Sequence, residues 1–176
     1  IKRMKSLILS ALAVATLAFS AQAQEKPAAS PAATTTQTVG LTEITVEYSR
    51  PSVKDRDIFG DLVPYGDVWR AGANAATKVT VSTDCTIGGA ELKKGSYALL
   101  ITPEKDQWTL HFFPYEGARW AEYRDGDTDA IVGKSTEIKK TSYTIESFGI
   151  MFDYLRDNSA NMHFIWDRAN VVVPVT

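Results

Sequence analysis

Four residues of one short stretch have side chains suited to holding a ligand: Tyr65, Trp69, Arg70 and Asn74. Aromatic rings stack on the apolar faces of sugars and peptides, and a guanidinium or an amide then fixes the orientation through hydrogen bonds. Glycines interrupt the stretch, which is typical of a loop, and binding residues gather on loops. The alternative is structural, with Trp69 filling one end of the fold while Arg70 satisfies loop carbonyls or a buried carboxylate. We expect Trp69 to be mainly structural, with Arg70 and Asn74 ordering the loop.

Catalysis would need a nucleophile beside a base, or several metal ligands that converge. The chain has two histidines, His111 and His163, and neither lies in a catalytic or metal-binding motif. We expect His111 on a solvated strand face, as a further candidate ligand contact, and His163 as a hydrogen-bonded rim residue. A small hydrolase would have to bring carboxylates such as Glu43 or Asp84 to His111. The residues therefore favour a protein without catalytic residues, metal or cofactor, and the hydrolase is kept as an alternative.

The single cysteine, Cys85, excludes an internal disulfide and a cysteine-rich zinc site. It follows the parity of Val79, Val81 and Ile87, so its thiol should point inward. Burial raises the pKa of a thiol and makes it a poor nucleophile. We therefore expect an inert cysteine in the core.

The elements that must position these residues alternate apolar and polar side chains with a period of two, which predicts half-buried strands. The predicted strands are 43–48, 78–87, 96–102, 107–113, 131–139, 143–154, 160–167 and 171–175. Turns are predicted at Gly88-Gly89, Pro103–Asp106, Asp157–Ser159 and Arg168–Asn170. About seven to nine strands at this spacing indicate an all-β fold, an antiparallel β-sandwich of jelly-roll-like or Greek-key type. At most one short helical turn is expected, at Asp57–Val63.

The first 23 residues have the features of a signal peptide. A basic start precedes the apolar run Leu7–Phe19, and Ala21-Gln22-Ala23 supplies the small-x-small cleavage pattern. A run of about 13 residues is too short to cross a bilayer. We expect cleavage after Ala23, no membrane span afterwards, and export to the periplasm or the extracellular space.

Residues 24–38 are rich in Ala, Pro, Ser and Thr, and we expect them to form a flexible leader. An added edge strand over Thr34–Val39 is the alternative. A single β-sandwich domain should then occupy residues 39–176. The chain has a net charge of −2, and without a basic excess it is not expected to bind nucleic acid.

The run YSRPSVKDRDIFGDLVPYGDVWRAGANAATKVTVS, residues 48–82, closely resembles the bacterial domain-of-unknown-function family 2911 (DUF2911). IGGAELKKGSYALLITP, Trp108, and Trp166-Asp167 with the closing VVVPV are similar to later segments of that family. The chain departs from the family pattern at Lys93-Lys94-Gly95 and in the long, charged segment Tyr115–Asp129. The resemblance implies an exported protein of a family frequent in Bacteroidota, and it implies no activity.

Together these observations predict a non-catalytic binding or accessory module of the bacterial envelope. Its partner would be a glycan, a peptide or a protein of the envelope. Two alternatives stay open: the small hydrolase that uses His111, and a structural subunit that assembles through an exposed sheet edge.

Overall fold

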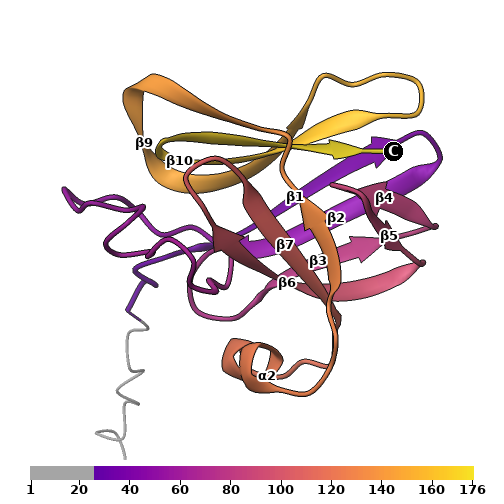
Figure 1. The fold of residues 1–176 in the computed structure, drawn as a ribbon, viewed down its shortest axis with the longest axis horizontal. Coiled ribbons are helices and arrows are strands. Elements are labelled where there is room, and N and C mark those ends of the chain that lie inside the picture. Colours follow the sequence, from indigo (N-terminus) through magenta and orange to yellow (C-terminus); the bar gives the residue numbers. More distant parts are fainter. Residues whose placement is uncertain (1–25) are drawn as a thin grey trace, which may run out of the picture.

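The computed structural model describes residues 26–176, and the predicted signal peptide with its cleavage site lies outside the described residues. Two antiparallel sheets contain ten strands, and a single short helix accompanies them in this part of the chain (Figure 1). The predicted all-β sandwich is therefore confirmed, with one strand more than the expected seven to nine. No helix within residues 26–176 is long and apolar enough to cross a membrane.

The larger sheet has six strands in the order β1-β2-β3-β6-β7-β8. They are β1 (Ala32–Val39), β2 (Thr42–Ser49), β3 (Thr77–Val81), β6 (Gly95–Pro103), β7 (Trp108–Pro114) and β8 (Ile131–Lys134). The residues of β2 alternate between buried and more exposed positions, as the period-two pattern requires. The predicted hairpin at Pro103–Asp106 joins β6 to β7.

The smaller sheet has four strands in the order β5-β4-β10-β9. They are β4 (Cys85–Ile87), β5 (Ala90–Leu92), β9 (Glu137–Asp153) and β10 (Ala160–Val175). Gly88 and Gly89 form the predicted turn between β4 and β5 with φ angles of 59° and 85°, which favour glycine. The sequence pattern did not specify this unequal division into six and four strands.

The flexible leader predicted over residues 24–38 is wrong for its second half. Strand β1 begins at Ala32 and pairs with β2 along its whole length. The structure therefore agrees with the alternative, an added edge strand over Thr34–Val39. Three consecutive threonines favour extended backbone, and Gly40 takes a φ of 60° in the tight turn that joins the two strands. The composition of this segment resembled a linker, but pairing with β2 orders it.

The strand predicted over Lys78–Ile87 is two strands in different sheets. β3 ends at Val81 and β4 begins at Cys85, and the chain crosses from one sheet to the other between them. The Asp84 carboxylate accepts hydrogen bonds from the Lys93 ammonium and the Lys94 backbone, both at 2.9 Å, and so holds the crossing. The apolar residues of β3 and β4 fall on the same alternating positions, so the alternation alone could not show that these are two strands.

Strand β10 doubles back on itself, and β9 bends with it (Figure 1). Nδ1 of His163 and Oδ1 of Asn170 lie 2.8 Å apart, whereas the same separation along a straight strand would span about 23 Å. Asp167 takes a φ of 52°, and the register between β9 and β10 shifts on both sides of it. The reversal predicted at Arg168–Asn170 therefore lies at Asp167, inside β10, where the β9–β10 ladder is irregular.

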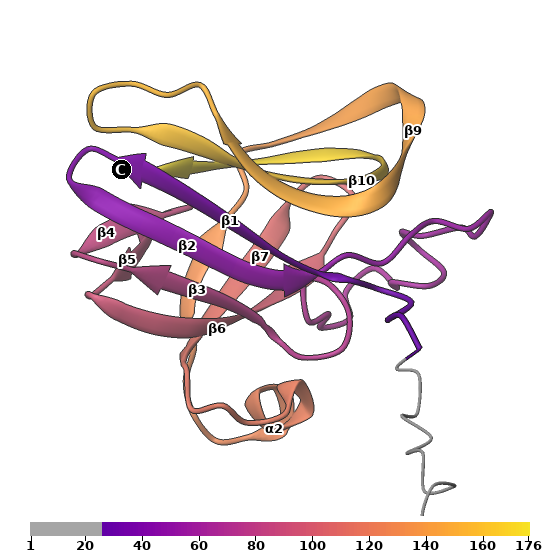
Figure 2. The same cartoon turned by 180° about the vertical axis from the view of Figure 1, so that it is seen from behind.

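The short helix does not lie at Asp57–Val63, where the sequence predicted at most one helical turn. Asp57–Val63 forms an irregular turn in which the Val63 amide donates to the Ile58 carbonyl (2.8 Å). The helix is α2 (Trp120–Asp125), inside the long, charged segment Tyr115–Asp129. It lies outside the six-stranded sheet (Figure 2). There Tyr123 packs on outward-facing side chains of β6 and β7, among them Leu100 and Phe113.

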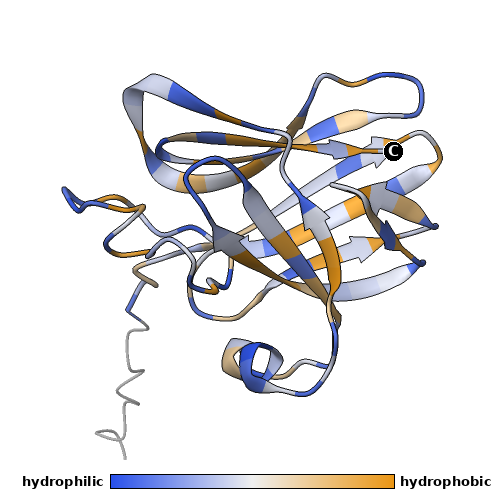
Figure 3. Cartoon of the chain, viewed as in Figure 1, coloured by the Kyte–Doolittle hydropathy of each residue, from blue (hydrophilic) through white to orange (hydrophobic). Residues whose placement is uncertain are grey.

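The main core lies between the two sheets, where apolar side chains of both sheets form one cluster. Figure 3 shows apolar residues spaced along the strands, and polar residues gathered in the turns and α2. At one end of the cluster five aromatic rings pack together: Phe59, Trp69, Trp108, Phe148 and Trp166. This aromatic cluster joins the β2–β3 connection to both sheets.

The outer edge of β9 is closed by the end of β2 and the residues after it. The backbone amide of Ile150 donates to the Tyr48 hydroxyl (3.0 Å), and that of Phe148 donates to the Pro51 carbonyl (2.9 Å). The Arg50 guanidinium donates to the Phe148 carbonyl at 2.7 Å. Covered edges resist pairing with other chains. Strand β1, at the edge of the larger sheet, pairs only with β2 in the sheet order.

Cys85 is half-buried against the core, as its parity predicted. Burial, with the nearby Asp84 carboxylate as a smaller cause, raises the pKa of its thiol to about 11. Because each pKa unit lowers the thiolate fraction tenfold, we expect a maleimide at pH 8 to label the native protein at least about tenfold more slowly than the unfolded protein. Quench-time mass spectrometry measures both rates, and equal rates would contradict the inward position.

Candidate functional site

The long connection between β2 and β3, residues 50–76, forms one wall of a cavity at one end of the sandwich. Its backbone is fixed to neighbouring strands: the Trp69 amide and the Ile101 carbonyl are joined at 2.7 Å, and so are the Ile101 amide and the Trp69 carbonyl. The Gly66 amide donates to the Pro103 carbonyl (2.9 Å). Long connections that are ordered in this way are commonly functional.

The opposite wall is the bend shared by β9 and β10. It brings Lys140 of β9 and Asp167, Arg168 and Ala169 of β10 to the cavity. Asp167 is not a glycine, and a left-handed backbone at such a residue is uncommon and concentrates at functional sites. Bulged, irregular ladders are also frequent beside binding sites. The strongest backbone irregularity of the smaller sheet thus faces the cavity.

The cavity has a volume of about 290 Å³, near the lower limit for small-molecule sites. Its apolar part is formed by Phe59 and Trp108, whose ring centroids are 5.0 Å apart. Tyr65 stands at the rim, half-exposed, with its ring against Gly60. The remaining lining residues are Glu104, Lys105, Ile138, Lys140, Asp167, Arg168 and Ala169. An aromatic floor is therefore surrounded by a charged rim.

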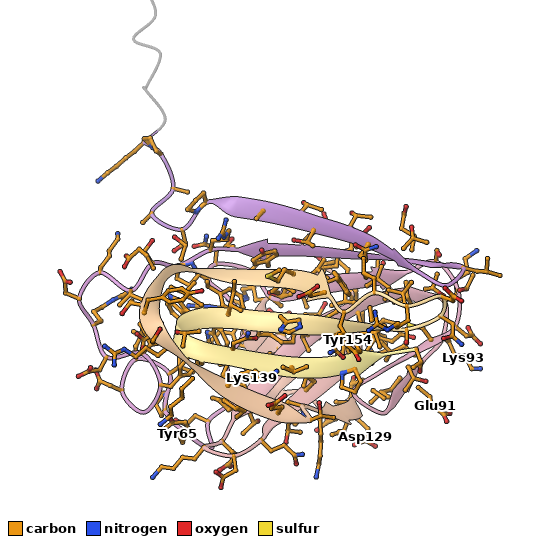
Figure 4. All side chains as sticks on the ribbon, turned by 90° about the horizontal axis from the view of Figure 1, so that it is seen from above. Tyr65, Glu91, Lys93, Asp129, Lys139 and Tyr154 are labelled. Carbon is orange, nitrogen blue, oxygen red and sulfur yellow. The ribbon has the colours of Figure 1, made fainter. Side chains whose placement is uncertain are left out.

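Of the five residues predicted for the site, only Tyr65 lines this cavity. Figure 4 shows Tyr65 at one end of the sandwich, with Glu91 and Lys93 at the other end. Lys105, on the β6–β7 hairpin, has its ammonium 6.0 Å from the centre of the Tyr65 ring.

Trp69 lies behind the cavity, in the aromatic cluster. Its ring stacks on Trp166 with centroids 5.8 Å apart and an angle of 17°, and it meets Phe148 edge-on at 5.1 Å. Its indole N–H donates to the Gly72 carbonyl (3.1 Å). The structure therefore packs Trp69 against the core, although its side chain is only half-buried. Its exposed part lines a second, smaller cavity together with Arg70 and Trp120.

Arg70 and Asn74 point away from the cavity. The Arg70 guanidinium lies 5.1 Å from the centre of the Trp120 ring in α2, instead of meeting loop carbonyls or a buried carboxylate as expected. Asn74, at a φ of 60°, donates its side-chain amide to the Ser30 carbonyl and the Ser49 hydroxyl, each at 3.2 Å. Both residues therefore hold the β2–β3 connection against its neighbours, and they do not form one site with Tyr65.

His111 is half-buried, which corrects the expected solvated position. Its Nε2 lies 3.0 Å from the Thr102 hydroxyl on the adjacent strand, and burial lowers the pKa of its imidazole. Neither carboxylate of the hydrolase alternative reaches it, since β3 and β6 separate β2 from β7 and Asp84 is paired with Lys93. His163, with its Nδ1 near Asn170, is the hydrogen-bonded residue that was expected.

Among residues 26–176 no three His, Cys, Asp or Glu side chains converge as metal ligands would. The sequence analysis did not assign the other lining residues to a site: Phe59, Glu104, Lys105, Trp108, Ile138, Lys140, Asp167, Arg168 and Ala169. The predicted turns at Pro103–Asp106 and Arg168–Asn170 contain four of them: Glu104, Lys105, Arg168 and Ala169. Only the bend of β9 and β10 brings Arg168 and Ala169 opposite Tyr65.

Comparison with known proteins finds one family. The model of DUF2911, described as a protein of unknown function, matches residues 30–175. This range includes β1, in agreement with the ordered start of the domain. No curated protein and no solved structure shows significant similarity to the chain.

Proposed function

The chain belongs to the DUF2911 family, and from the geometry of its end cavity we propose that it is an exported, non-catalytic binding module for carbohydrate. One observation supports this most directly: a cavity of about 290 Å³ combines an aromatic floor with an exposed, polar rim. The C–H faces of a sugar ring are apolar, while its hydroxyls need donors and acceptors around the ring edge. The cavity offers both kinds of surface at the scale of one or two sugar units.

Tyr65 is the residue whose removal tests this role, because it contributes to the cavity and not to the core. Tyr65→Ala should weaken the binding of oligosaccharides found on a glycan array about tenfold, because one aromatic contact is lost. The array should contain glucose, galactose, mannose, N-acetylglucosamine and uronic acid oligomers, and calorimetry on the hits gives the affinities. Thermal stability should stay near that of the unchanged protein, since Tyr65 is 40% exposed.

Tyr143→Ala is the matched control, because Tyr143 is a 66% exposed tyrosine on β9 that does not line the cavity. It should leave binding unchanged. Equal losses for the two variants, or no binding by any glycan, would contradict the proposed site. Chromatography of the bound glycans should recover them uncleaved, and cleavage would contradict the non-catalytic part of the proposal.

Export is supported by the residues that precede the described part of the chain. The basic start, the apolar run Leu7–Phe19 and Ala21-Gln22-Ala23 are the features of a signal peptide. Intact-mass analysis of protein isolated from its native envelope should give a chain that begins at Gln24. A recovered chain that retains Leu7–Phe19 would contradict export with cleavage.

A further inference from the structure

The charges at the rim of the cavity point to the kind of sugar that it binds. Three cations and two carboxylates line it: Lys105, Lys140, Arg168, Glu104 and Asp167. Within residues 26–176 none of them forms an ion pair, whereas Lys78, Lys93, Arg119, Arg124 and Lys139 all do. The rim therefore has one excess positive charge and no internal pairing to satisfy it.

The three cations reach the cavity from three separate elements. Lys105 comes from the β6–β7 hairpin, Lys140 from the bend of β9, and Arg168 from the bend of β10. A bound anion would interact favourably with each of these cations. The backbone reversal at Asp167 is what presents the adjacent Arg168 at the rim.

We propose that the ligand is a uronic acid, a sugar ring with a single carboxylate, held with that carboxylate against Arg168 and Lys140. This inference rests on the proposed carbohydrate-binding function and deepens it. The planar guanidinium of Arg168 matches a planar carboxylate through two parallel hydrogen bonds. The half-buried Phe59 ring receives the apolar face of the sugar, with the buried Trp108 ring packed behind it.

The two rim carboxylates restrict the ligand further. Glu104 and Asp167 accept hydrogen bonds from sugar hydroxyls, which are donors, and they repel a second negative charge. One excess positive charge fits one carboxylate better than the doubly charged phosphate of a sugar phosphate. The rim thus selects a singly charged polyhydroxy acid.

The test compares matched sugars on the full mature protein. Calorimetry should give affinities for the methyl glycosides of glucuronic and galacturonic acid that are at least about tenfold higher than for the methyl glycosides of glucose and galactose. A roughly tenfold difference corresponds to one charge-assisted hydrogen bond. The difference should shrink as salt is raised, because these cations are exposed. Glucose 6-phosphate should bind more weakly than either uronide.

Charge-removing variants locate the contact. Arg168→Gln and Lys140→Gln should each reduce uronide affinity about tenfold and leave the neutral glycosides unaffected. Lys139→Gln is the control, because Lys139 is the neighbour of Lys140 on β9, pairs with Glu137 at 3.2 Å and does not line the cavity. It should change neither affinity.

The outcomes separate this inference from the proposed function. Equal binding of uronides and neutral glycosides, reduced by Tyr65→Ala, would overturn the acidic ligand and leave the carbohydrate site standing. Uronide binding that responds to Lys139→Gln as strongly as to Lys140→Gln would overturn the assigned contact. Absence of binding for every sugar would overturn both proposals.

Discussion

Replacing Trp69 with alanine is expected to lower the free energy of unfolding by about 3 kcal/mol, the lower end of the cost of removing a large packed aromatic, because the ring is half-buried against the core. The ring contacts Phe59, Trp108, Phe148 and Trp166, so its loss opens a cavity where the β2–β3 connection meets both sheets. The substitution also leaves the Gly72 carbonyl without its indole donor. Urea denaturation followed by circular dichroism measures the change.

Two further variants make this result interpretable. Trp69→Phe retains an aromatic ring but loses the indole N–H, and should destabilise the protein less than alanine does. Tyr143→Ala removes an exposed ring and should change stability by no more than about 0.5 kcal/mol. A Trp69→Ala protein as stable as the unchanged one would show that Trp69 is not a core residue, and would return it to the candidate binding surface.

Gly133→Ala is the second substitution with a large expected effect. A Cβ on Gly133, in β8, would lie 2.6 Å from the Ile87 carbonyl oxygen and 3.2 Å from the Ala90 side chain. The first contact is with backbone, so β8 and the β4–β5 hairpin must move apart, and the Lys134 amide that donates to the Gly88 carbonyl (2.8 Å) moves with them. We expect a loss of about 1–3 kcal/mol from this overpacking, with more for Gly133→Val.

Val132→Ala is the control at the adjacent position, because Val132 is 48% exposed on the same strand. It should change the free energy of unfolding by about 0.5 kcal/mol or less. Thermal denaturation of Gly133→Ala, Gly133→Val and Val132→Ala ranks the three variants by melting temperature. If Gly133→Ala melts at the same temperature as Val132→Ala, the close approach of β8 to the β4–β5 hairpin is wrong.

Strands β2 and β7 could be predicted from the sequence because most of their residues alternate between buried and more exposed positions, and alternation is a local property. Strand β6 is buried on both faces over Tyr97–Ile101, and the predicted turn at Pro103–Asp106 marked its end. Strand β1 was predicted as a flexible leader because its small polar residues give no hydrophobic signal, and only pairing with β2 orders it. The separation of β3 from β4 was missed for a related reason. The inward-facing residues of β3 and β4 fall on the same alternating positions, so the crossing between the two strands leaves no break in the pattern.

The candidate site was predictable only in part. Tyr65 was identified from its residue type and its loop, and it does line the cavity. Trp69, Arg70 and Asn74 are its neighbours in sequence, but positive φ angles at Gly66, Ala71 and Gly72 turn the backbone between them, and their side chains contact different parts of the fold. Lys140 and Arg168 lie far from Tyr65 in sequence, and no local pattern shows that β9 and β10 bend together.

The stacking of Trp166 on Trp69 has a consequence for how the chain is made. Trp166 belongs to β10, the last strand along the chain, which lies inside its sheet between β4 and β9. Trp69 and Phe148 emerge earlier from the ribosome, and until β10 follows they have no partner that completes their packing. Contacts between distant segments form late in folding. Packing of this aromatic cluster can therefore be completed only after β10 has been synthesised.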